Sequence, residues 1–448
     1  MFKTNKDELT IKDIKSFIDL HAEDKMKYEK LQDYYLGKHD ILMTLKDKDV
    51  PNNMLVHSYP KYITDMLTGY FIGQPVKYSA VDKDSEKDDA LLKTLDEIFK
   101  YNDEQEENLE LAKIASIKGV SYEILWLDDD KRIRFKKLQP DEVFLIHDNT
   151  LEEKIRFAVR YYTSFIDGKE VENIELYDKQ KISYFDNSKG QLLLTHEELH
   201  SFQDVPIIMY ENNAEELGDF EQVISLIDAY NKAQSNTLND MEQFTDAYLV
   251  LTNLSGTQYD DIKELKEKRI FLMEADGGAS WLIKDVNDAW VENYKKRLKA
   301  DIHKFSYTPD MTDENFGSNL SGVSLRYKLL GMEQIRSTKE RKFKKGLQRR
   351  IELICNVLQI SSNLNNYTSI GMQFNNTLPQ NILEIAQIIQ ALSPYLPIET
   401  LIEQLPFVEN AKEEMEKKKM EDDTSEDYES LLSMLPTGAT EEESHDEE

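Results

Sequence analysis

The sequence predicts an α+β protein that is predominantly helical. Three observations lead to this class. Apolar residues recur at helical spacing in the first and last parts of the 448-residue chain, and they alternate with period two through the middle third. A proline-free segment of good helix formers also runs from Leu325 to Leu358. A chain of this length provides two to four packing units.

The composition is that of a globular, strongly acidic protein. Its formal net charge is −31, and Glu421–Glu448 holds 12 acids without Lys or Arg, which predicts a disordered tail. This excess of acid excludes a stand-alone nucleic-acid binder, because affinity for phosphate needs clustered cations. The single cysteine, Cys355, excludes an internal disulfide and is expected to be a buried thiol. No apolar run reaches the ~18 residues of a membrane span.

The first 219 residues predict helices followed by a β-rich layer. Helical spacing covers Met1–Asp40, where Gly37 ends the pattern, then Ser58–Phe71 and Leu91–Lys118. From Gly119 the period becomes two. The predicted strands, separated by turn signals, are Tyr122–Trp126, Ile133–Phe135, Val143–Ile146, Phe157–Tyr162, Asn173–Tyr177, Ile182–Phe185 and Gln191–Leu194.

Two further predicted helices, Phe220–Thr245 and Asn287–Phe305, flank a small insert. The first is polar on all sides from Asn231 to Asp240, so the core of its own domain cannot hold it. This pattern predicts packing between subunits or the lining of a wet channel. The insert is expected to contain strands at Ala247–Leu251, Arg269–Glu274 and Ser280–Lys284, with a turn at Asp276-Gly277-Gly278.

The stretch Ser306–Leu358 organises the rest of the chain: a loop rich in Gly and Asn leads into a long helix. The helix, taken from Gly322, would be roughly 55 Å long. Ser321–Arg350 holds ten Lys or Arg residues, which indicate either a solvated helix face or a contact surface for a partner or DNA. Its expected core positions are Leu325, Leu329, Met332, Phe343, Leu347, Ile351 and Ile354.

One motif suggests metal chemistry. The sequence His196-Glu197-Glu198-Leu199-His200 matches H-E-x-x-H, in which a helix presents two zinc ligands and a general base. Here it follows a predicted strand, so exposed histidines on a loop or strand edge are the simpler interpretation. A zinc metallopeptidase is kept as the alternative function. The sequence contains no G-x-x-x-x-G-K-[ST] phosphate loop, and we expect neither a cofactor nor enzymatic activity.

Several short segments of the sequence resemble, in the same order, segments of the portal proteins of tailed double-stranded-DNA bacteriophages, in particular the long flexible-tailed (siphovirus) type. The resemblance covers nearly the whole chain. It includes Tyr62-Ile63-Thr64-Asp65, Gly73-Gln74-Pro75-Val76, Leu226-Ile227-Asp228-Ala229-Tyr230-Asn231, Tyr307-Thr308-Pro309-Asp310, Asn319-Leu320-Ser321-Gly322-Val323-Ser324, Lys328-Leu329-Leu330-Gly331-Met332-Glu333-Gln334 and Pro406-Phe407-Val408.

The resemblance implies a portal fold that forms a ring, usually a dodecamer, at one vertex of the capsid. Each chain would contribute a wing, a stem, a clip and a crown. The implied segments are wing 1–219 and 321–374, stem helices 220–245 and 287–305, clip 246–286, tunnel loop 306–320, crown 375–420 and acidic tail 421–448.

The same resemblance nominates three groups of functional residues. Tunnel-loop residues facing DNA would be Thr308, Asp310, Asp313, Asn315, Phe316 and Asn319. Candidates for transient DNA contact on the stem are Lys295, Arg297 and Lys304. Clip residues facing the adaptor or terminase would be Lys263, Lys266, Arg269, Asp276 and Gly277.

The implied function is a conduit for packaging and ejecting double-stranded DNA. Its expected partners are further copies of itself, the DNA, the terminase large subunit, the head–tail adaptor, and the major capsid and scaffolding proteins, with no membrane. The expected location is the capsid portal vertex of the virion, after assembly in the host cytoplasm. A net negative channel is compatible with this role, because it repels DNA and so does not hold it.

Overall fold

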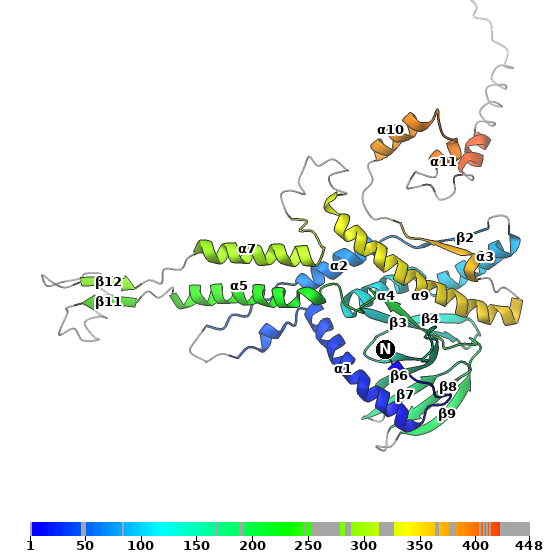
Figure 1. The fold of residues 1–448 in the computed structure, drawn as a ribbon, viewed down its shortest axis with the longest axis horizontal. Helices are drawn as coiled ribbons and strands as arrows, with labels where there is room; N and C mark the ends of the chain where they lie inside the picture. The colour runs from blue at the N-terminus through cyan, green and yellow to red at the C-terminus, as the bar shows by residue number, and fades with distance from the viewer. Residues whose placement is uncertain are drawn as a thin grey trace, which may run out of the picture. The chain divides into compact units, whose positions relative to one another are not determined.

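Figure 1 shows the chain as a computed structural model with both helices and sheets, as the α+β prediction requires. The chain divides into two compact units, Met1–Thr377 and Leu378–Glu448. The structure describes residues 2–45, 51–82, 85–166, 168–187, 192–244, 248–252, 278–282, 288–312, 327–362, 367–375, 382–402, 405, 408, 411 and 414–421.

Helices open the first unit. They are α1 (Ile11–Tyr35), the 3-10 turn η1 (Asp40–Met43), α2 (Tyr59–Ile72), α3 (Glu86–Tyr101) and α4 (Glu104–Lys118). Thr10 and Asp13 form a capping box that satisfies free N–H groups at the start of α1. After α1 the chain passes through Gly37 at φ +81°, so the predicted stop is confirmed.

The helix predicted over Leu91–Lys118 is broken into α3 and α4. Asp103 has φ +51°, a left-handed conformation that a right-handed helix cannot contain. The side chain of Asn102 stabilises the break, because its Nδ2 donates to the carbonyl oxygens of Ile98 (2.8 Å) and Ile133 (3.0 Å). The second of these bonds comes from a strand far along the chain, so local periodicity does not reveal it.

The β-rich layer contains a six-stranded sheet in the order β1-β5-β6-β7-β8-β9, antiparallel except for the β1–β5 pair. Its inner face packs on α1 through a cluster that includes Ile14, Phe144 and Val159. The strands are β1 (Phe2–Lys3), β5 (Val143–His147), β6 (Ile155–Ile166), β7 (Lys169–Tyr177), β8 (Lys181–Asp186) and β9 (Leu193–Leu199).

A second, three-stranded antiparallel sheet has the order β10-β3-β4. It comprises β10 (Ile207–Glu211), β3 (Val120–Leu127) and β4 (Ile133–Leu138). A short ladder pairs β13 (Ile370–Gln373) with β2 (Lys77–Ala80). Six of the seven predicted strand segments therefore lie within observed strands. The seventh, Gln191–Leu194, overlaps β9 only at Leu193 and Leu194, because β9 continues to Leu199.

The long predicted helix is α9, Leu330–Ser362, with 33 residues and a length of about 50 Å. It lies beside α2 and β10 in the centre of the first unit (Figure 1). The predicted core positions are confirmed for Leu329, Met332, Phe343, Leu347, Ile351 and Ile354, which are all buried, whereas Leu325 lies outside the described residues. Cys355 is buried as predicted, and burial raises the pKa of its thiol to about 12.

A buried arginine joins α9 to the elements beneath it. Arg350 is 1% exposed, and its guanidinium binds Glu123 of β3 through two bonds, Nε–Oε2 at 2.8 Å and Nη2–Oε1 at 2.6 Å. Its Nη1 donates to Glu104 (3.1 Å) and Asn108 (2.8 Å) of α4. Removing one partner of such a buried pair costs roughly 3–5 kcal/mol, since the other charge stays buried.

The backbone of α9 approaches β10 closely at Gly346, one turn before Arg350. A Cβ placed there would lie 2.4 Å from Cδ1 and Cε1 of Tyr210. The Tyr210 ring cannot easily move away, because it is fully buried and its hydroxyl donates to Glu123 at 2.8 Å. Glycine is therefore required by packing at this position.

The second unit contains, among its described residues, α10 (Ile382–Leu392) and α11 (Ile398–Ile402). Leu401 of α11 is buried, with 4% exposure.

We expect Gly346→Ala to lower the free energy of unfolding by about 1–3 kcal/mol, because the new methyl group overpacks against Tyr210. The matched control is Gly69→Ala in α2, where nothing lies within 4 Å of the added Cβ. It should be neutral or stabilising through helix propensity. Denaturant unfolding followed by circular dichroism measures both; equal midpoints for the two variants would contradict the close approach.

Candidate functional site

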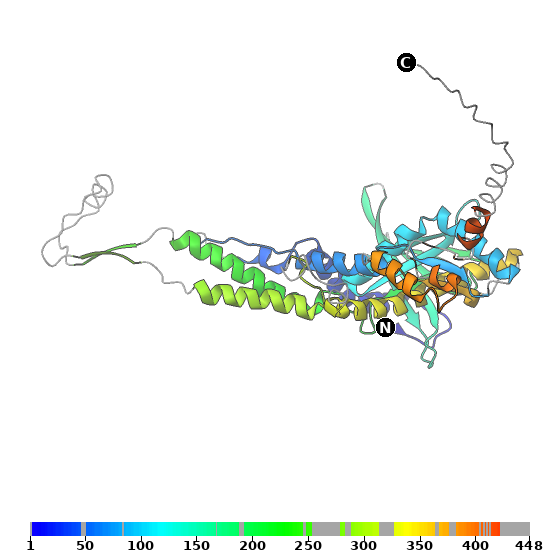
Figure 2. The same cartoon turned by 90° about the horizontal axis from the view of Figure 1, so that it is seen from above.

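Two long helices, α5 (Ile224–Phe244) and α7 (Asp288–Phe305), lie side by side and project from the layers that contain the sheets (Figures 1 and 2). Beyond their ends, β11 (Tyr248–Thr252) pairs antiparallel with β12 (Gly278–Leu282). The expected strand at Ser280–Lys284 is found in part as β12, which begins already at Gly278 of the expected turn and pairs with β11. Arg269–Glu274, its expected partner, lies outside the described residues.

One polar stripe of α5 is bound within the chain. Asn231, Ser235 and Asn239 are at most 7% exposed, because the segment 53–57 runs along them. Their side-chain oxygens accept backbone N–H bonds from His57 (2.9 Å), Leu55 (2.9 Å) and Asn53 (2.7 Å), respectively. This stripe is therefore bound by the chain's own residues 53–57, whereas packing between subunits or the lining of a channel stays a prediction for the other sides of α5.

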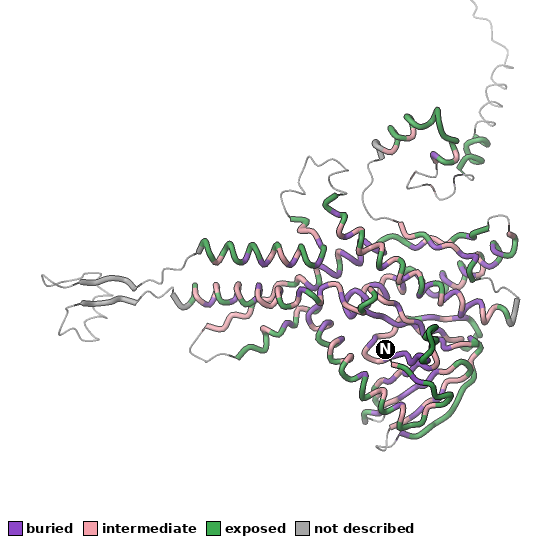
Figure 3. The backbone as a smooth tube through the Cα atoms, in the orientation of Figure 1, coloured by how far each residue is buried: buried purple, intermediate pink, exposed green. Residues whose placement is uncertain are grey.

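The geometry of this contact follows from the rise per residue of an extended segment and of an α-helix. Every second residue of an extended segment advances about 6.6 Å. Every fourth residue of an α-helix advances about 6 Å. Successive N–H groups on one side of residues 53–57 therefore meet successive side chains of α5. We call residues 53–57 the strap, since they bind α5 over two turns; Figure 3 shows the partly buried tube of this segment beside α5.

The base of the loop that follows α7 is fixed by three side chains. Tyr62 of α2 donates to the carbonyl oxygen of Pro309 (2.8 Å) and accepts from the N–H of Met311 (3.2 Å). His303 Nδ1 donates to the carbonyl oxygen of Thr308 at 2.9 Å. Lys299 pairs with Asp310 at 2.6 Å. These contacts therefore fix the position of the residues with which the loop begins.

Asp310 is charged over the whole neutral range. Partial burial favours its neutral form, but hydrogen bonds from Lys299 and Thr312 outweigh this and lower its pKa to about 2. Because the folded pKa is below the usual value of 3.8, the stabilisation is complete above about pH 4. It is lost as the pH falls toward 2.

The predicted DNA-facing residues differ in their exposure to solvent. Arg297 and Lys304 are exposed on α7. Lys295 is instead 7% exposed and pairs with Glu292 at 2.5 Å, so it is not available to DNA in this chain. Thr308 is fully buried at the loop base, which corrects its placement on the tunnel surface. Outside the described residues lie Asp313, Asn315, Phe316, Asn319, Lys263, Lys266, Arg269, Asp276 and Gly277.

The basic residues of α9 are largely bound within the chain. Neither a solvated helix face nor a free contact surface for a partner or DNA therefore describes five of the ten basic residues of Ser321–Arg350, which are ion-paired within the chain. Lys339 pairs with Asp219 at 2.6 Å and donates to Ser116 at 2.6 Å. Burial lowers the pKa of Lys339, opposed by Asp219. The other four residues form seven ion pairs: Arg336 with Glu333 and Glu340, Lys342 with Glu211, Arg349 with Asp204 and Glu352, and Arg350 with Glu104 and Glu123.

The H-E-x-x-H sequence does not form a zinc site. It lies at the end of β9, where four extended residues span about 13 Å, too far for two ligands of one ion. His196 stacks on Tyr184 with ring centroids 4.2 Å apart, and His200 Nε2 donates to the carbonyl oxygen of Asp178 at 2.9 Å. Within the described ranges, no three His, Cys, Asp or Glu residues form a metal-binding group. The interpretation of an exposed histidine on a strand edge is confirmed for His196, whereas His200 is half-buried, and nothing in the described residues supports the metallopeptidase.

We expect Asn231→Ala to release the strap from α5, because the N–H of His57 loses its acceptor. Hydrogen–deuterium exchange of the peptide containing Leu55 and His57 should accelerate about tenfold, as the loss of one buried bond implies. Asn236→Ala, on the exposed side of the same helix, should leave exchange unchanged. An unchanged rate in both variants would show that the strap is held by other contacts.

Comparisons with known proteins agree with this architecture. The sequence matches the family described as "Phage portal protein, SPP1 Gp6-like" over residues 14–428. It is 25% identical over 394 residues to the portal protein of Bacillus phage SPP1, covering 83% of this chain and 76% of that protein. It is 22% identical over 457 residues to the portal protein of Clostridium phage phiCD119, covering 94% and 99%.

The match covers α1 from Ile14 onward, the two larger sheets apart from β1, the α5–α7 pair and α9. Among the described residues, no helix has both the length and the apolar content needed to cross a bilayer. Both named relatives are portal proteins, and the resemblance in the sequence is confirmed over most of its length. The chain therefore belongs to the phage portal protein family.

Proposed function

We propose that copies of this chain assemble into a ring, of dodecameric type, at one vertex of the capsid. Double-stranded DNA passes through its central channel during packaging and ejection. The observation that carries this proposal is the exposed aromatic surface on α7. Trp290 is 65% and Tyr294 42% exposed, and their rings stack in parallel with centroids 5.9 Å apart. A helix that presents such a surface on a projecting pair is suited to packing against a neighbouring subunit.

In the proposed ring, α5 and α7 form the stem and β11–β12 belong to the clip. The wing would comprise 1–219 and 321–374, and the crown 375–420. The strap supports this assignment, because it joins α5 to the proposed wing within one chain, and Tyr62 of α2 binds the base of the loop that follows α7. A projecting stem joined at fixed points is what a stiff channel wall requires.

The channel surface should repel DNA overall while touching it weakly. The net charge of −31 supplies the repulsion. Arg297 and Lys304 on α7 are the cations proposed for transient phosphate contact. Lys295 and Thr308 are left out, because their side chains are buried. Asp310, Asp313, Asn315, Phe316 and Asn319 remain the proposed loop residues.

The proposed partners follow from the family. The clip, with Lys263, Lys266, Arg269, Asp276 and Gly277, would bind the terminase large subunit and later the head–tail adaptor. The wing and crown would contact major capsid and scaffolding proteins during assembly in the host cytoplasm. The family is structural, so we propose that the chain itself is not an enzyme and that the terminase supplies the work.

Mass photometry of the purified protein should reveal annular assemblies, and Trp290→Ser with Tyr294→Ser should shift them toward monomers. The aromatic area lost at each subunit contact explains this direction. Phe165→Ser is the control, since Phe165 is 73% exposed on β6 in the six-stranded sheet, away from the stem. The proposal fails if the unaltered protein stays monomeric at every salt concentration.

Arg297→Gln with Lys304→Gln should leave ring formation intact and weaken the salt-dependent binding of double-stranded DNA. The log–log slope against salt should flatten by about 0.9 for each phosphate contact removed. Lys100→Gln on α3, which removes an exposed cation elsewhere in the chain, is the control. Identical slopes for the two proteins would place the DNA contacts on other residues.

A further inference from the structure

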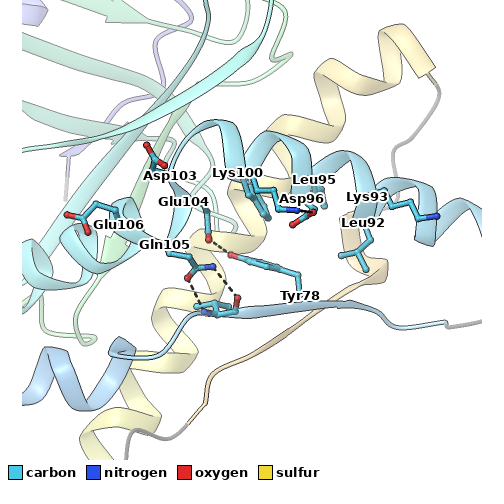
Figure 4. A pocket seen from close by; sticks show the side chains of 12 residues that line it. Tyr78, Leu92, Lys93, Leu95, Asp96, Lys100, Asp103, Glu104, Gln105 and Glu106 are labelled. Atoms are coloured by element: carbon cyan, nitrogen blue, oxygen red, sulfur yellow. Dashed lines mark hydrogen bonds and ion pairs between the residues drawn. The ribbon is translucent and has the colours of Figure 1, made fainter. Parts of the chain in front are cut away.

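Buried polar networks of two kinds occur in the first unit. Around the Glu104 carboxylate every bond comes from a donor, namely Tyr78, Asn108 and Arg350, and Figure 4 shows the bond from Tyr78. The network beside the strap contains a side-chain amide instead. Asn231 of α5 donates from Nδ2 at one end of this amide and accepts at Oδ1 at the other. An amide can exchange these two roles by turning, whereas a carboxylate cannot.

The hydrogen-bond partners determine where the protons of the second network lie. The carbonyl oxygen of Tyr34 can only accept, so His39 Nε2, 3.1 Å away, carries a proton. His39 Nδ1 then accepts from Asn231 Nδ2 at 2.9 Å, and the ring is neutral. The backbone N–H of His57 can only donate, so the atom 2.9 Å from it is the amide oxygen of Asn231. His57 Nδ1 donates to the same oxygen at 3.1 Å.

The neutral His39 ring lies where a positive charge is costly. It is 1% exposed and stacks on Tyr34 with ring centroids 4.5 Å apart. Burial lowers its pKa below the usual 6.5; the bond to Tyr34 and the charges of Asp228 on α5 and Asp40 on η1 oppose this, and His57 of the strap adds to it. Because the folded pKa is the lower one, the stability that neutral His39 confers is complete above pH 6.5 and declines as the pH falls.

Protonation of His39 reverses the requirement at Nδ1. The new N–H would face the Nδ2 group of Asn231, which also donates, across 2.9 Å. A half turn of the amide about its Cβ–Cγ bond brings Oδ1 to His39 and Nδ2 to His57. The turned amide is favoured, because a hydrogen bond from a charged donor is roughly twice as strong as a neutral one. The backbone N–H of His57 then loses its acceptor on α5.

Protonation of His57 has no such effect. Its Nδ1 already donates to Asn231, so a second proton goes to Nε2 and the bond to the amide stays. The two histidines flank one amide, but only the charge on His39 turns it. The other bonds of the strap, from the N–H groups of Leu55 and Asn53, end on different residues of α5 and do not involve His39. The change is therefore confined to the end of the strap next to α2.

We propose that His39 and Asn231 form an acid-sensitive switch on the strap. When His39 takes up a proton, the amide of Asn231 turns and the N–H of His57 is released from α5. The switch goes beyond the proposed conduit, because it is a property of the single chain and depends on neither ring formation nor the passage of DNA. It makes the contact between α5 and the segment that leads into α2 weaker in acid than at neutral pH.

Hydrogen–deuterium exchange resolved to single amides tests the switch in the full-length protein. The protection of the His57 amide, divided by that of the Leu55 amide, should fall about tenfold between about pH 7.5 and about pH 5, as the loss of one buried hydrogen bond implies. The ratio removes the pH dependence of the exchange chemistry itself. Asn231→Asp, whose carboxylate can accept from both histidines at once, should keep the His57 amide protected at the lower pH.

A second variant keeps the test decisive if Asn231→Asp does not fold. His39→Gln cannot take up a proton, so its protection ratio should be the same at both pH values. His196→Gln, which removes an exposed histidine of β9, is the control and should respond like the unaltered protein. A constant ratio in the unaltered protein, or a fall that persists in His39→Gln, would overturn the proposal. Equal acceleration at Leu55 and His57 would also overturn it, because the whole strap would then open.

Discussion

The burial of Arg350 is the constraint on which the first unit depends. Its guanidinium satisfies Glu123 on β3 and Glu104 on α4 at the same time, so α9, α4 and β3 can only pack in one register. The aromatic rings of Phe135 and Tyr210 cover it, with the charge centre 4.5 Å and 5.9 Å from their centroids. Such a buried charge is tolerated only when its partners are in place, and this makes the assembly of the three elements cooperative.

Basic residues of the same helix, α9, pair with several acids of this strongly acidic chain. Lys339, Lys342 and Arg349 pair with acids that come from the segment before α5 and from the β-layer. Five of the basic residues of α9 are thus used for folding, and the net charge of the chain is strongly negative. A net charge of this sign suits a portal protein, because a DNA conduit must let its cargo slide.

The α5–α7 pair is joined to this core by contacts of a different kind. Backbone N–H groups of the strap bind side-chain oxygens on α5, and Tyr62 binds backbone groups at the loop base. Side-chain amides and hydroxyls hold the helix without requiring apolar burial. This explains how α5 remains ordered although its sequence from Asn231 onward contains few apolar residues. The polarity of that stretch indicated a partner, but it did not indicate that the partner was the chain's own residues 53–57.

The sequence by itself determined the class of fold, six of the nine described strands in the two larger sheets, the apolar stripe of α9 and the family, because periodicity and ordered short motifs are local properties. Only the tertiary structure decided which charges are free. Lys295 is buried, and so is the uncharged Thr308. The strap covers one stripe of α5. Lys339 and Arg350 lie at positions of the apolar stripe of α9, where they pair with acids from distant segments. A charged residue at a stripe position was the available signal, yet its partner depends on which segments fold together, and local sequence carries no information about that.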